Sequence, residues 1–70
     1  MEDDNTNNYA IGDLVLVSDI HYNIEDMVMV VDKITPKEGR FEYTLESRSG
    51  LRSIIVGVKS ITALIWSAKR

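Results

Sequence analysis

The stretch that decides the fold is FEYTLES, residues 41–47. Three apolar residues, Phe41, Tyr43 and Leu45, alternate there with the polar residues at even-numbered positions from 40 to 46. Successive side chains of a β-strand point to opposite faces, so this alternation predicts a strand with one face on a core and the other in water.

Turn signals lie on both sides of this strand. The preceding segment, TPKEGR (35–40), contains Pro36, which pre-sets φ for a turn, and Gly39, which tolerates positive φ. The following Ser49-Gly50 pair indicates a second tight turn. We therefore expect hairpins at both ends of the strand.

Two further strands should flank these hairpins. Met27–Ile34 (MVMVVDKI) opens with five apolar residues, which indicates burial on both faces or a partner interface on one. Arg52–Val58 (RSIIVGV) reads as a fourth strand, in which Gly57 suggests a bulge or bend.

The ends of the chain are less regular. Gly12-Asp13 indicates a turn before a first short strand, Leu14–Val17, and the polar segment Ser18–Asp26 reads as a long loop. Residues 59–68 have two interpretations: a single 3₁₀ turn followed by a fifth strand, or a short helix whose apolar residues recur at i, i+3 and i+4. Residues 1–8 read as a disordered acidic tail, and residues 9–70 as a single domain.

Five short strands joined by hairpins favour an all-β fold, a small barrel that curls to close its edges. This order, with GDLV at 12–15 and a 3₁₀ turn before the last strand, resembles SH3-like small barrels, in particular the Tudor and KOW groups. The chain departs from KOW modules at Asp26, where they carry glycine, and from SH3 domains proper at Phe41, near their groove tryptophan. The resemblance implies a five-stranded SH3-like barrel over residues 9–67.

Composition narrows the chemistry. The 70 residues include no cysteine and one histidine, which excludes a disulfide, a thiolate site or a multi-histidine zinc site within one chain. So small a domain is marginally stable by itself, so we expect homo-oligomerisation. No signal segment and no run of about 18 apolar residues is seen, so the expected location is cytoplasmic, without membrane contact.

Charge is unevenly divided along the chain. Residues 1–32 hold eight acids and no Lys or Arg, whereas residues 33–70 hold eight bases and three acids. One interpretation is that the two halves neutralise each other across paired strands. The other is a dipolar surface with a basic face for an anionic partner.

The segment ESRSGLRS, residues 46–53, is the first candidate site. Arginine forks and converging backbone N–H groups bind anions, although the order of a P-loop is missing. The alternative is a plain hairpin turn with solvated arginines. The residues that could hold an anion are Ser47, Arg48, Ser49, Gly50, Arg52 and Ser53.

A second candidate is the acidic segment 19–26, whose spacing fits no metal loop but which suits contact with a basic partner surface. His21 could make that contact sensitive to pH. An aromatic cage of Tyr22, Phe41 and Tyr43 is conceivable, but the alternation places the last two in the core. The expected partner-binding residues are Asp19, Tyr22, Glu25, Asp26, Arg48 and Arg52.

No nucleophile, acid–base or nucleotide motif is recognisable, so we expect no enzyme, no catalytic residue, no metal and no cofactor. The leading hypothesis is a non-catalytic protein-interaction module, a small regulator or inhibitor of a larger complex. One alternative is an oligomer that sequesters a phosphate- or nucleotide-like anion. The other is a KOW-like nucleic-acid binder using the basic second half, against which the pI of about 4.9 argues.

Overall fold

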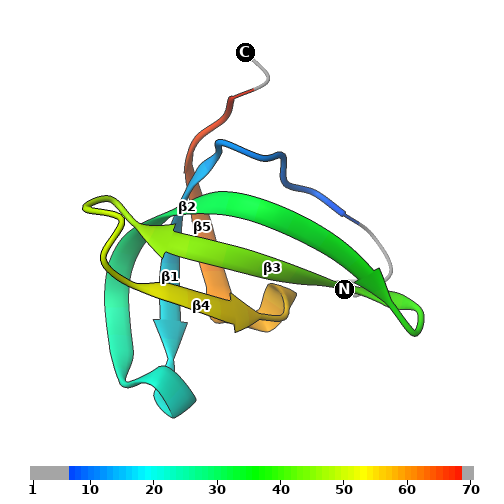
Figure 1. The fold of residues 1–70 in the computed structure, drawn as a ribbon, viewed down its shortest axis with the longest axis horizontal. Helices are drawn as coiled ribbons and strands as arrows, with labels where there is room; N and C mark the ends of the chain where they lie inside the picture. Colours follow the sequence, from blue (N-terminus) through cyan, green and yellow to red (C-terminus); the bar gives the residue numbers. More distant parts are fainter. Residues whose placement is uncertain (1–6, 69–70) are drawn as a thin grey trace.

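A computed structural model describes residues 7–68, which form one antiparallel sheet of five strands with two 3₁₀ turns (Figure 1). The strands occur in the order β4-β3-β2-β1-β5, so β4 and β5 are the two edges. This confirms the predicted all-β class and number of strands. The elements are β1 (Leu14–Asp19), η1 (Ile20–Tyr22), β2 (Ile24–Lys37), β3 (Arg40–Ser47), β4 (Ser53–Val56), η2 (Val58–Ser60) and β5 (Ile61–Trp66).

The long strand β2 gives the sheet its curl (Figure 1). Its first half pairs with β1 through Ile24–Val30, and its second half pairs with β3 through Met29–Lys37. The register with β3 shifts between Val31 and Lys33, so Asp32 stands at a bulge. Bulges increase local twist, and here the bulge falls where β2 passes from one partner strand to the other.

The core is built from residues of all five strands and of η2. The apolar face of β3 is buried as its alternation predicted: Tyr43 and Leu45 are fully buried, and Phe41 is partly buried and packs against the core. Tyr9 meets Tyr43 edge to face, with ring centroids 5.4 Å apart. The other buried apolar residues are Val15, Val17, Ile24, Met29, Val31, Ile54, Val56, Val58 and Ile61.

The prediction of a long loop over Ser18–Asp26 is wrong. β1 continues to Asp19 and β2 already begins at Ile24, with only the three-residue turn η1 and Asn23 between them. Asn23 adopts a left-handed conformation, φ 56°, which asparagine tolerates well. The polarity that suggested a loop reflects strand ends whose side chains face water.

Two other boundaries also differ from the prediction. Thr35–Lys37 belongs to β2 rather than to the turn, which consists of Glu38 and Gly39, both at positive φ. Pro36 is tolerated because β2 pairs there only with β3. Gly57 is not a bulge inside the fourth strand; β4 ends at Val56 and Gly57 caps η2.

In the segment 59–68, the structure has the end of a 3₁₀ turn followed by the fifth strand, as the first interpretation predicted, and the helical alternative is wrong. Helical spacing was misleading because β5 exposes five successive residues on both faces, so its apolar pattern does not follow burial. No helix within residues 7–68 is long and apolar enough to span a membrane.

Both ends of the described chain are tied to the sheet. Asp13, 2% exposed, accepts hydrogen bonds from the N–H of Ala10 (2.9 Å) and from that of Ala68 (2.7 Å). Residues 1–6 of the predicted tail lie outside the described residues. Asn7, which was assigned to the tail, accepts a hydrogen bond from the hydroxyl of Tyr43 (2.9 Å).

Candidate functional site

The carboxylate of Asp19 organises the η1 turn. One oxygen accepts the N–H groups of His21 (2.9 Å) and Tyr22 (3.3 Å), and the other accepts the hydroxyl of Ser60 (2.6 Å). The Ser60 hydrogen bond is the main cause that holds the pKa of Asp19 below its ordinary value. Both carboxylate oxygens of Asp19, which was predicted as a partner contact, therefore accept hydrogen bonds within the molecule.

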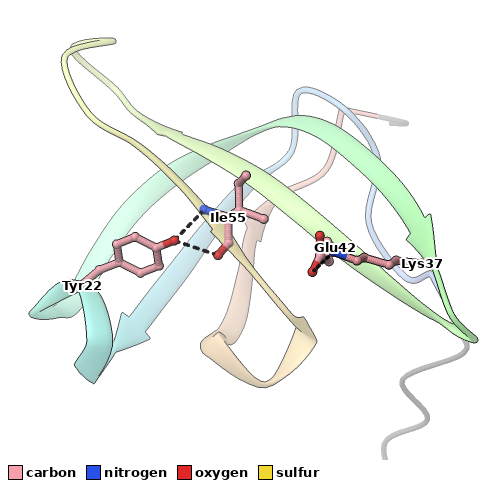
Figure 2. Close-up of polar contacts among 4 residues, drawn as sticks. All are labelled: Tyr22, Lys37, Glu42 and Ile55. Carbon is pink, nitrogen blue, oxygen red and sulfur yellow. Dashed lines mark hydrogen bonds and ion pairs between the residues drawn. The ribbon is translucent and has the colours of Figure 1, made fainter.

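Tyr22 fastens the same turn to the edge strand β4 (Figure 2). Its hydroxyl donates to the carbonyl of Ile55 (3.1 Å) and accepts from the N–H of Ile55 (3.4 Å). The guanidinium of Arg52 donates to the carbonyl of Tyr22. Two predicted partner-binding residues are thus brought together, and the hydroxyl of Tyr22 covers the backbone of Ile55 on the β4 edge.

The other predicted contact residues are exposed. Glu25 and Arg48 lie open to solvent, as does Asp26, whose N–H donates to the hydroxyl of Ser18 (3.0 Å). Asp26 also adopts positive φ, 51°, at the start of β2. The side chains of Glu25 and Arg48 remain available to a partner, whereas the carboxylate of Asp26 also accepts a hydrogen bond from the hydroxyl of Ser18 (3.4 Å).

The loop after β3 is a self-contained turn. The N–H groups of Gly50 and Arg52 donate to the carbonyl and hydroxyl of Ser47 (2.9 and 3.1 Å), and that of Leu51 donates to the hydroxyl of Ser49 (3.3 Å). An anion cradle needs converging N–H groups that are free. Because this loop uses three of them internally, its geometry favours the hairpin interpretation, although anion binding there stays a prediction.

The opposite edge of the sheet is different in character. β5 has a single strand neighbour, β1, and its sequence ITALIW carries no charge and no proline. Leu64, Ile65 and Trp66 are 45%, 50% and 54% exposed, and they line a shallow groove together with Ser67. Natural edge strands are commonly protected by charge, proline or a covering element. Among residues 7–68, a covering side chain is seen only on β4, whereas β5 shifts register against β1 at Thr62 and Ile65, a bulged geometry that also protects edges in part.

Neutralisation of the two halves through ion pairs is not seen among residues 7–68. The one ion pair they form joins Lys37 to Glu42 at 3.8 Å, and both belong to the second half (Figure 2). Lys69 and Arg70, two members of the proposed basic stripe, lie outside the described residues. The described bases are all exposed and come from the β2, β3 and η2 segments and the loop before β4.

A cleft of about 510 Å³ was not anticipated from the sequence. It forms where η1, the start of β3 and η2 meet, and it is lined by His21, Arg40, Phe41, Glu42, Gly57, Val58, Lys59 and Ser60. No sequence signal could locate it, because its three segments, two 3₁₀ turns and the start of a strand, are distant along the chain.

The remaining candidate, the aromatic cage, does not form, because Tyr43 is fully buried while Tyr22 bonds to β4. The described residues bring together no three His, Asp or Glu side chains that could hold a metal ion. Comparison with known proteins adds nothing to this geometry: no family model, no curated protein and no solved structure matches the chain.

Proposed function

We propose that the chain is a non-catalytic protein-interaction module whose β5 edge accepts a strand from another protein. One observation carries this proposal: β5 is an uncharged edge strand with three large apolar side chains about half exposed. An added strand would satisfy the outer backbone groups of β5, and its side chains would cover Leu64, Ile65 and Trp66. A small regulator or inhibitor of a larger complex would act in this way.

The contrast between the two edges supports the choice of β5. On β4, the N–H and carbonyl of Ile55 are both bonded to the hydroxyl of Tyr22. An incoming strand would have to displace that side chain. No hydrogen bond of this kind from a side chain to the backbone of β5 is seen among residues 7–68.

We also propose that the curled sheet is an SH3-like small barrel. The strand order, the long β2 shared between β1 and β3, and the 3₁₀ turn η2 directly before the last strand support this assignment. An experimental structure with a different strand order would contradict it.

The interaction is tested with two matched variants. Ile65→Lys places a charge on the β5 edge, whereas Leu51→Lys makes the same kind of change at a residue that is 90% exposed in the loop before β4. When tagged chains are expressed in cells and recovered, the wild type and the Leu51→Lys variant should retain the partner protein. The Ile65→Lys variant should lose it. Equal retention by all three would overturn the assignment of the β5 edge.

Self-association at the same edge is distinguished by sedimentation of the purified chain. A dimer that Ile65→Lys dissociates, with no partner recovered from cells, would show that the strand on β5 comes from a second copy. Trp66 is the only tryptophan and reports directly on this edge. Its emission should shift to shorter wavelength when a strand covers β5.

A further inference from the structure

The cleft between η1, β3 and η2 combines positive charge with an apolar floor. Arg40, Lys59 and His21 line the cleft, and all three are exposed. Neither Arg40 nor Lys59 forms an ion pair with any of residues 7–68. The one carboxylate in the lining, that of Glu42, already faces Lys37 at 3.8 Å. In a chain with net charge −3, this cleft therefore has a local excess of positive charge.

The floor of the cleft is supplied by core residues. Val58 is buried and Phe41 is half-buried, and both line the cleft. Gly57 also lines the cleft, and the space beside it is open, because a Cβ atom built at this position meets nothing within 4 Å. The result is a hollow where a ligand side chain can lie on apolar atoms while charged groups reach the rim.

We propose that this cleft binds an acidic peptide segment of a partner protein, with carboxylates near Arg40 and Lys59 and an apolar side chain over Phe41 and Val58. Its volume lies within the range of about 300–1,000 Å³ typical of ligand pockets. The site lies beside η2, at the opposite end of β5 from Leu64–Trp66 (Figure 1), and it does not depend on strand pairing at the β5 edge.

A peptide suits this arrangement better than a small phosphate-like anion. Phosphate sites draw several donors together on one group, with backbone N–H groups or paired arginine forks aimed at a point. Here the two bases come from separate elements, the start of β3 and η2, with an apolar floor between them. Two bases on separate elements can each meet a different carboxylate along a chain, and the apolar residues Phe41 and Val58 can receive an apolar side chain of the same chain.

The experiment uses the full chain and a fluorescein-labelled octapeptide of alternating glutamate and leucine, followed by fluorescence anisotropy. Two variants lower the net charge by the same amount: Arg40→Ala with Lys59→Ala inside the cleft, and Lys33→Glu outside it. All three residues are exposed and none forms an ion pair within residues 7–68. Gly57→Leu, at an extended backbone position with open space, adds an apolar side chain to the cleft lining without changing charge.

The cleft double variant and Gly57→Leu should each weaken binding about tenfold, whereas Lys33→Glu should bind within about twofold of wild type. Equal weakening by the cleft double variant and by Lys33→Glu would mean that only the net charge matters and would overturn the proposal. So would failure of the wild type to bind the peptide at millimolar concentration. Displacement of the peptide by inorganic pyrophosphate at micromolar concentration would assign the cleft to a small anion instead.

Discussion

The hydroxyl of Tyr22 occupies both backbone hydrogen-bonding groups of Ile55, 33 residues away, at 3.1 and 3.4 Å. Ile55 lies in the middle of β4, an edge strand, and these groups would otherwise be open to another chain. A side chain from the β1–β2 connection thus protects one edge of the sheet, and the other edge, β5, remains accessible.

Tyr22→Phe tests this protection. The substitution keeps the ring but removes both hydrogen bonds, and because water can replace the hydroxyl at this exposed site, we expect a loss of about 0.5–1 kcal/mol in the free energy of unfolding. The amide of Ile55 should exchange its hydrogen faster than in wild type. Denaturant titration and amide hydrogen exchange measure the two effects. Unchanged exchange at Ile55 would show that the hydroxyl does not protect the edge.

Asp13→Ala should be the most damaging change of a single polar side chain. It leaves the N–H groups of Ala10 and Ala68 without their acceptor in a site where Asp13 is 2% exposed, so we expect a loss of about 3 kcal/mol in the free energy of unfolding. Asp32→Ala, at an exposed position, is the matched control and should change stability by less than about 0.5 kcal/mol. Equal effects in denaturant titrations would contradict the structural role of Asp13.

Features of the fold that depend on neighbouring residues were predicted from the sequence, and features that depend on distant residues were not. The alternation in FEYTLES predicted β3 to within one residue, because a strand with one buried face has period two. Gly39 marked the β2–β3 turn through its own conformational preference, and it does adopt φ 81°. Ser18–Asp26 was misassigned because polarity was taken to mean a loop, whereas solvated strand ends are equally polar.

The candidate site was less predictable because its contacts are non-local. Tyr22 and Arg52 were named as partner contacts on composition, yet they bond within the molecule, across 33 and 30 residues respectively. The cleft depends on three segments that meet only after the sheet has curled. Nothing in the local sequence of Arg40 or Lys59 indicates that the two residues line the same hollow.

Acid unfolding should depend on Asp19. Its pKa is lowered in the folded state, mainly by the Ser60 hydroxyl, so the folded chain releases this proton more readily than the unfolded chain. The resulting stabilisation is present above the ordinary pKa of 3.8 and is lost as the pH falls through the lowered value. Asp19→Asn and Ser60→Ala should each flatten the decrease in melting temperature below about pH 4. Thermal melts from pH 2 to 7 test this, and a wild-type slope in both variants would refute it.

Gly12 and Gly57 form a matched pair, because substitution by alanine should lower the free energy of unfolding at one and raise it at the other. At Gly12, φ is 97° and an added Cβ would lie 3.2 Å from the Cβ of Ala68, so Gly12→Ala should lower the free energy of unfolding by about 1–3 kcal/mol. At Gly57 the backbone is extended, φ −87° and ψ 177°, and the space is open, so Gly57→Ala should raise that free energy by about 0.4–1 kcal/mol through the unfolded state. Denaturant titrations of the two variants and the wild type measure both effects. A destabilising effect of Gly57→Ala would contradict the extended backbone conformation of Gly57 at the start of η2.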